Sequence, residues 1–119
     1  MEIKLIDSEL KIMEILWKEG DTTAKRIAEI TREHIGWSKT TTYTIIKKCL
    51  DKGAIERNDP NFVCHALITR EQAQEFETTE LINKMYDGAA DRLIASILGR
   101  NNLTPQEIDR LKQLVDSLE

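Results

Sequence analysis

The chain has 119 residues, of which 40% are hydrophobic and 32% charged, and its formal net charge is −4. This length and balance predict one small folded domain, with or without an oligomerisation extension, and exclude a disordered tail. No stretch approaches the roughly 20 apolar residues of a membrane span, and the first residues lack the basic and apolar regions of a signal peptide. We therefore expect a cytoplasmic protein.

The charge is unevenly distributed along the chain. Residues 1–70 carry twelve Lys and Arg against eleven Asp and Glu, whereas residues 71–119 carry five against ten. The segment 37–57 holds five cations and only two anions. Because contact with phosphates depends on local charge, the acidic total does not exclude binding to nucleic acid.

Two short amphipathic helices are predicted near the N-terminus. The first is capped by Asp7 or Ser8 and runs to about Glu19. Its inward face, at helical spacing, consists of Leu10, Met13, Leu16 and Trp17, widened by Ile12 and Ile15. The second helix follows a cap at Thr22 or Thr23 and ends near His34. Its apolar face consists of Ala24, Ile27, Ala28 and Ile30.

The third predicted helix is the most informative stretch. Ser38 can cap its start, and Gly53 can adopt the left-handed conformation that ends helices. One face is apolar and turns to the core: Thr42, Ile45, Ile46, Cys49 and Leu50. The other carries hydroxyls, an aromatic ring and lysines: Lys39, Thr40, Tyr43, Thr44, Lys47 and Lys48. This second face suits the phosphates and base edges of a DNA major groove, although an ordinary solvated surface accounts for the same residues.

A β-hairpin is predicted after the third helix. Residues 54–57 and 62–68 are β-prone runs, and the turn-forming sequence Asn-Asp-Pro-Asn separates them at residues 58–61. The second strand is predicted to be longer than the first. Three helices followed by a hairpin form a winged helix-turn-helix, so we predict a mainly α fold with a small β-hairpin over residues 1–70.

Residues 71–119 are predicted to form a helical dimerisation region. Thr69 and Gln72 form a capping box for a helix to about Tyr86, a second helix spans residues 89–98, and Thr104 with Pro105 begins a third. These helices are too short for a core of their own, so a second copy of the chain is expected to cover them, with packing within one chain as the alternative. The predicted dimerisation residues are Leu81, Ile82, Met85, Leu93, Ile94, Ile97, Leu98, Ile108, Leu111, Leu114, Val115 and Leu118.

The sequence offers little support for an enzyme, a metal site or a cofactor. Cys64 and His65 are adjacent in a predicted strand and so point to opposite faces, and His34 is distant from both. No nucleophile motif or metal-ligand spacing is present. Cys49 and Cys64 are too few for a disulfide framework, and we expect both to be small buried apolar residues.

Three blocks in order along the chain resemble one known family. Residues 9–17, ELKIMEILW, resemble its first-helix pattern E-[WL]-x-[IV]-M-x-x-[IL]-W. Trp37-Ser38 and the threonine-rich helix that ends at Lys52-Gly53 resemble its recognition block. Residues 103–111, LTPQEIDRL, resemble its C-terminal signature. The family is that of the penicillinase repressors, BlaI/MecI-like, which includes the copper-responsive CopY branch.

The resemblance implies a homodimeric transcriptional repressor. Its winged helix would bind a palindromic operator, and its C-terminal helices would interlock two subunits. In the penicillinase branch, a membrane-bound sensor with a zinc metallopeptidase domain leads to cleavage of the repressor in its C-terminal part, and the operator is released. The same route, with antibiotic resistance as the regulated property, is what the resemblance implies here.

Three departures from the family pattern bear on these expectations. Lys39 and Tyr43 stand where the family commonly has proline and a basic residue, so the operator sequence is expected to differ. Ser96 and Ile97 align with the scissile Asn-Phe bond and are the candidate cleavage site, and the alternatives are cleavage at a different bond or no proteolytic induction. No cysteine lies beyond Cys64, which excludes copper sensing through the C-terminal cysteine cluster of the CopY branch.

The sequence therefore predicts a DNA-binding repressor with named contact residues. Threonines and Tyr43 are expected at base edges, lysines at phosphates, and the wing at the adjacent backbone or in the minor groove. The candidate DNA-binding residues are Lys39, Thr40, Thr41, Tyr43, Thr44, Lys47, Lys48, Arg57 and Asn61. The main alternative is a winged helix that docks an acidic protein partner without sequence-specific DNA binding, and a ligand-sensing regulator is the third. The sequence does not identify the operator, the regulated genes or the inducing signal.

Overall fold

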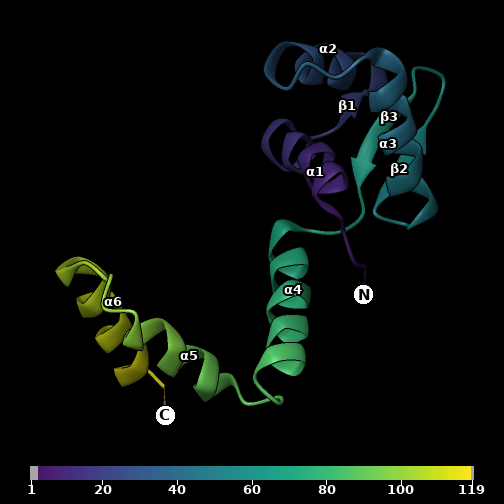
Figure 1. The fold of residues 1–119 in the computed structure, drawn as a ribbon. Helices are drawn as coiled ribbons and strands as arrows, with labels where there is room; N and C mark the ends of the chain where they lie inside the picture. The colour runs from purple at the N-terminus through teal and green to yellow at the C-terminus, as the bar shows by residue number, and fades with distance from the viewer. Residues whose placement is uncertain (1–2, 119) are drawn as a thin grey trace. The chain divides into compact units, whose positions relative to one another are not determined.

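The computed structural model describes residues 3–118, and the chain divides into two compact units, Met1–Thr78 and Thr79–Glu119. The first unit contains α1 (Asp7–Glu19), β1 (Thr22–Thr23), α2 (Ala24–His34), α3 (Lys39–Asp51), β2 (Ile55–Asn58), β3 (Val63–Ala66) and the start of α4 (Arg70–Met85) (Figure 1). The second contains the rest of α4, α5 (Ala90–Gly99) and α6 (Pro105–Asp116). The division between the two units falls within α4, whereas the domain boundary predicted from the sequence, between residues 70 and 71, lies at the start of this helix.

Side-chain caps fix the beginnings of α2 and α3 as predicted. The Thr23 hydroxyl accepts a hydrogen bond from the Arg26 backbone N–H, and the Ser38 hydroxyl accepts one from the Thr41 N–H, each at 3.1 Å. Gly53 follows α3 with φ of +80°, a conformation that a β-carbon disfavours. Local sequence alone therefore sets where the helix-turn-helix begins and ends.

Two capping boxes begin α4 and α6. At α4, the Gln72 carboxamide oxygen accepts from the Thr69 N–H at 2.8 Å, and the Thr69 hydroxyl accepts from the Gln72 N–H at 3.0 Å. The same reciprocal pair joins Thr104 and Glu107 at 2.9 and 3.1 Å. The hydrogen bond from the Thr104 backbone N–H lowers the pKa of the Glu107 carboxyl. Both boxes agree with the sequence prediction.

The start of α1 differs from the prediction. Neither Asp7 nor Ser8 caps this helix, because both lie inside its first turn and the N-cap position is Ile6, which makes no side-chain cap. The Glu9 carboxylate instead accepts a hydrogen bond from the Ile6 backbone N–H at 2.9 Å. This second half of a capping box is enough to set the start of the helix without a polar cap residue.

The inward face of α1 also differs from the prediction at two neighbouring positions. Leu10 was predicted to face inward but is 38% exposed, whereas Glu9 is only 1% exposed. The Glu9 carboxylate is buried because the Lys52 ammonium, just beyond α3, forms an ion pair with it. The same ammonium donates to the Lys4 carbonyl at 2.7 Å, so one lysine joins the end of α3 to the segment that leads into α1.

A three-stranded antiparallel sheet, in the order β1-β3-β2, closes the first unit. The hairpin was predicted, but β2 and β3 each have four residues, so the prediction of a longer second strand was wrong. The strand β1 was not predicted at all. It pairs Thr22 with Cys64 and Thr23 with Val63, and these pairings tie the start of α2 to the hairpin.

The core of the first unit lies between α1, α2, α3 and the sheet. Its largest fully buried side chains are Ile12, Met13, Ile27, Ile46, Glu9, Thr31, Thr42, Cys49 and Cys64. Both cysteines are buried, as predicted, and burial raises the pKa of the Cys49 thiol to about 12 and that of Cys64 to about 11. Both thiols therefore remain protonated and act as small apolar groups.

Residues 3–118 contain neither a membrane-spanning helix nor a cluster of metal-binding side chains. None of the helices there is long and apolar enough to cross a membrane. Within the same residues, there is no group of three or more His, Cys, Asp or Glu side chains that could hold a metal ion.

Candidate nucleic-acid interface

The outer face of α3 presents the hydroxyls and lysines that the sequence assigned to DNA. Tyr43 is half-buried, and the other residues of this face are exposed: Lys39, Thr40, Thr41, Thr44, Lys47 and Lys48. A shallow depression of about 400 Å³ runs along this face and is lined by Lys39, Thr40, Tyr43, Thr44 and Lys47. The structure thus brings five of the predicted α3 residues together on one surface, while Thr42 turns to the core as predicted.

A buried pair of hydroxyls fixes α3 on α2. The Thr31 and Thr42 side-chain oxygens lie 2.6 Å apart, and both residues are fully buried. The Thr31 hydroxyl also lies 3.2 Å from the Ala28 carbonyl, which can accept its proton when Thr42 donates to Thr31. A buried hydroxyl without a hydrogen-bond partner destabilises the fold. This pair therefore favours a single position of α3 on α2, which in turn determines which residues of α3 face outward.

An aromatic contact joins α3 to the hairpin. The Tyr43 and Phe62 rings meet edge to face with centroids 5.9 Å apart, and the Arg57 guanidinium carbon lies 3.7 Å from the Phe62 ring centroid. The Phe62 carbonyl accepts from the Ala24 N–H at 2.9 Å, which holds this turn residue against α2. Phe62 was not among the predicted site residues. The one feature of the sequence that could have indicated Phe62 is its position, as an aromatic residue directly after the Asp-Pro-Asn turn.

The wing carries the two other predicted contact residues. Arg57 and Asn61 are both exposed, Arg57 on β2 and Asn61 in the turn. The Arg57 guanidinium also bonds the Asp59 carboxylate at 2.9 Å, so part of its charge is compensated in the free protein. The stacking on Phe62 and the bond to Asp59 together give this arginine a defined position at the edge of the α3 face.

The lysines of α3 differ in how far their charge is compensated. Lys47 pairs with Asp51 at 3.6 Å, one turn along the helix, and the Lys39 ammonium lies 5.7 Å from the Tyr43 ring centroid. Lys48 has no acidic partner in the part of the chain that the structure describes. Lys48 is therefore the α3 cation whose charge is most available to a phosphate.

The hydroxyls of α3 are partly used within the helix. The Thr44 hydroxyl donates to the Thr40 carbonyl at 2.9 Å, and the Thr41 hydroxyl accepts from the Ser38 hydroxyl at 3.0 Å. An outward-facing threonine whose proton is engaged still offers an acceptor oxygen and a methyl group. These are the groups that contact base donors and thymine methyls in a major groove.

One ion pair near the wing makes a testable prediction about pH. His65 Nδ1 lies 2.7 Å from the Asp21 carboxylate, and this hydrogen bond raises the pKa of the His65 imidazole above its ordinary value. A raised folded-state pKa means that the pair stabilises the fold below the ordinary pKa and that this stabilisation is lost as the pH rises through the folded value. We expect Asp21→Asn to lower the pKa of His65, measured by NMR titration of its ring protons. Asp51→Asn is the matched control because its partner is a lysine, and equal curves in both variants would disprove the coupling.

The second unit has an uncovered apolar surface. None of the residues of α5 or α6 is buried, and Ile94, Leu98, Leu114 and Val115 are each more than half exposed. An apolar groove of about 520 Å³ between α5 and α6 is lined by Ile94, Ile97, Leu98, Ile108, Leu111, Lys112, Val115 and Asp116. So much exposed apolar surface on a small unit is typical of an interface for another chain.

A winged helix with an exposed basic and hydroxyl-rich third helix is typical of DNA-binding proteins of the winged helix-turn-helix class. The penicillinase repressor family matches residues 5–117, and the chain belongs to it. The family consists of transcriptional repressors rather than enzymes.

Relatives and solved structures agree with this assignment. The methicillin resistance regulatory protein MecI of Mammaliicoccus sciuri is 25% identical over 115 residues, 95% of this chain and 94% of the relative. The penicillinase repressor of Bacillus licheniformis is 23% identical over 95% and 90% of the two chains. In structure, the DNA-binding domain of the repressor BlaI matches with a TM-score of 0.56, and the monomeric form of B. licheniformis BlaI in complex with the blaP half-operator matches with 0.52. Each is 22% identical and covers 60% of this chain and 90% of the matched chain, and these two likenesses show the fold.

Proposed function

We propose that this protein is a sequence-specific DNA-binding transcriptional repressor that acts as a homodimer on a palindromic operator. The observation that carries the proposal is the outer face of α3, which is fixed on α2 by buried hydroxyls and presents lysines and threonines together. Membership of the repressor family supports it, as does the likeness to a BlaI form bound to a half-operator. Such a protein acts on the chromosome, so we place it in the cytoplasm.

In this proposal α3 enters the major groove and the wing lies against the adjacent backbone. Thr40, Thr41, Tyr43 and Thr44 contact base edges, with Tyr43 held in place by Phe62. The cations Lys39, Lys47, Lys48 and Arg57 contact phosphates, together with Asn61. Lys47 and Arg57 exchange their present partners, Asp51 and Asp59, for phosphates, whereas Lys48 has no acidic partner to lose among residues 3–118.

Substitutions on α3 test the two kinds of contact separately. Lys48→Ala is expected to weaken binding to operator and random duplex alike and to reduce the slope of log K against log salt by about 0.9 per subunit, or about 1.8 for a dimer. Thr44→Ala is expected to cost about 1–3 kcal/mol on the operator and little on random DNA. Gel-shift titrations at several salt concentrations measure both, on DNA from upstream of the protein's own gene.

The matched control is Lys84→Ala, because Lys84 is an exposed lysine of the second unit. If Thr44→Ala weakened operator and random duplex equally, the assignment of base contacts would be wrong. If the unchanged protein bound no duplex even at low salt, the protein-docking alternative would replace the DNA-binding proposal.

The second unit is proposed to form the dimer interface, and the occupant of its apolar surface is a second copy of the chain. The first unit already has its own core, whereas α5 and α6 have no buried residue. We therefore assign dimerisation to residues 71–119 and DNA binding to residues 1–70. A two-fold dimer places two α3 helices on the two halves of a palindrome.

We also propose that proteolysis in the C-terminal part relieves repression, through a pathway that includes a membrane-bound sensor metallopeptidase. The aligned bond, Ser96–Ile97, lies inside α5, and the Ser96 hydroxyl lies 3.3 Å from the Tyr86 hydroxyl. A protease that requires an extended substrate therefore needs the C-terminal half of α5 to unfold locally before it can cut.

A further inference from the structure

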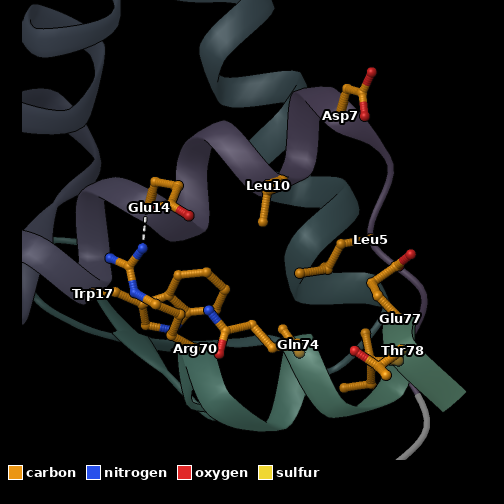
Figure 2. Close-up of a pocket in the computed structure, with 11 residues that line it drawn as sticks. Leu5, Asp7, Leu10, Glu14, Trp17, Arg70, Gln74, Glu77 and Thr78 are labelled. Atoms are coloured by element: carbon orange, nitrogen blue, oxygen red, sulfur yellow. Dashed lines mark ion pairs between the residues drawn. The ribbon is translucent and has the colours of Figure 1, made fainter. Parts of the chain in front are cut away.

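A cavity of about 350 Å³ opens between the N-terminal segment, α1 and the first turns of α4, all within the first unit. Figure 2 shows the Leu5 and Leu10 side chains pointing into this space, with Trp17 at one end and Gln74 on the α4 side. Its size is near the lower end of the roughly 300–1,000 Å³ range of small-molecule sites. The DNA-binding proposal uses none of these residues.

The floor of the cavity is apolar and already organised. The Trp17 indole N–H donates to the Ile68 carbonyl at 2.9 Å, so the polar atom of this ring is satisfied and its orientation is fixed. Leu10 is 38% exposed at the wall of the cavity, although neighbouring residues of α1 are buried. A ligand with an apolar body would cover this leucine and contact the indole without any change in the fold.

The rim of the cavity carries an excess of negative charge. The lining residues include three carboxylates, from Asp7, Glu14 and Glu77, and a single cation, Arg70. The Arg70 guanidinium bonds Glu14 at 2.7 Å and lies 5.3 Å from the Trp17 ring centroid. Glu77 pairs with Lys4 at 3.4 Å, and both side chains are half exposed. Even with Lys4 included, the carboxylates outnumber the cations.

We propose that this cavity binds a small organic cation, with its apolar body against Leu5, Leu10 and Trp17 and its ammonium group among the rim carboxylates. Carboxylates attract an ammonium group and the apolar floor attracts a hydrocarbon body, so an arylalkylamine uses both. An organic anion would meet the surplus carboxylates. A neutral compound would cover the floor but gain nothing from the charged rim.

The test uses full-length, ¹⁵N-labelled protein without DNA, so its outcome is independent of the proposed repressor function. Three probes that differ in charge are titrated: 4-phenylbutylamine, 4-phenylbutan-1-ol and 4-phenylbutanoate. The indole N–H signals of Trp17 and Trp37 are followed by NMR. We expect the amine to shift the Trp17 signal saturably, to leave Trp37 unchanged, and to bind at least tenfold more tightly than the alcohol or the carboxylate.

A pair of variants on the exposed side of α4 places the site. Gln74→Phe puts a ring into the cavity and is expected to weaken binding of the amine at least tenfold. Glu75→Phe makes a change of similar size outside the lining and is expected to preserve binding. The proposal is overturned if the amine binds no more tightly than the alcohol, if it shifts Trp37 as much as Trp17, or if Gln74→Phe has no effect.

Discussion

Replacing Lys52 with methionine is expected to lower the free energy of unfolding by about 3 kcal/mol, because it leaves the Glu9 carboxylate buried without a counter-charge. Glu9 is 1% exposed, whereas the Lys52 side chain is 34% exposed. The two partners are therefore not equivalent. Glu9→Gln leaves an ammonium that can turn to water and keeps an oxygen for the Ile6 N–H, so we expect a cost of about 1 kcal/mol.

Urea unfolding followed by circular dichroism measures this asymmetry. Lys47→Met, a change of the same type within α3, is the matched control, because the Lys47–Asp51 pair is largely exposed and such pairs contribute about 0.3–0.5 kcal/mol. The double variant Glu9→Gln with Lys52→Met is expected to be more stable than Lys52→Met alone. Equal losses for Lys52→Met and Lys47→Met would show that the buried carboxylate does not depend on its partner.

Val115→Glu is expected to raise the dissociation constant of the proposed dimer at least 100-fold. Val115 lines the apolar groove between α5 and α6 and is 64% exposed in the single chain, so the substitution costs the isolated unit little. In a two-fold interface the new carboxylate is present twice and loses its water on each side. A cost of about 2.7 kcal/mol, which corresponds to a 100-fold change, is modest for two such groups.

Sedimentation equilibrium over a range of protein concentrations measures the effect. Gln113→Glu is the control, because it adds the same charge on the same helix at an exposed position outside the groove. Operator binding by Val115→Glu is expected to fall toward that of a single subunit, while its far-ultraviolet spectrum is retained. A dimer of unchanged affinity in Val115→Glu would remove the second unit from the proposed interface.

The features that could be predicted from the sequence are those that depend on near neighbours in the chain. Ser38, Gly53 and the capping boxes act over three or four residues, so the helix ends they set were predicted. The division of α3 into a core face and an outer face follows from helical spacing alone. Thr42 was therefore assigned to the core although threonine is polar.

The features that were missed depend on contacts between distant positions. Glu9 is buried only because Lys52 reaches it from across the fold, and this burial leaves Leu10 exposed where the helical pattern predicted a core residue. The strand β1 has two residues and exists only through pairing with β3. Phe62 connects Tyr43 with Arg57 across three separate segments, which no local pattern indicates.

The hydroxyl pair between α2 and α3 has a consequence for how this protein can evolve. Changing Thr31 alone to valine leaves the Thr42 hydroxyl in the core without its Thr31 partner, and changing Thr42 alone removes that partner from Thr31. Changing both to valine keeps the side-chain volume and removes both buried hydroxyls. The two single steps are not equivalent, because Thr31 keeps the Ala28 carbonyl as a hydrogen-bond partner when Thr42 changes first. Among descendants of this sequence, a change to an apolar pair should therefore begin at Thr42 more often than at Thr31.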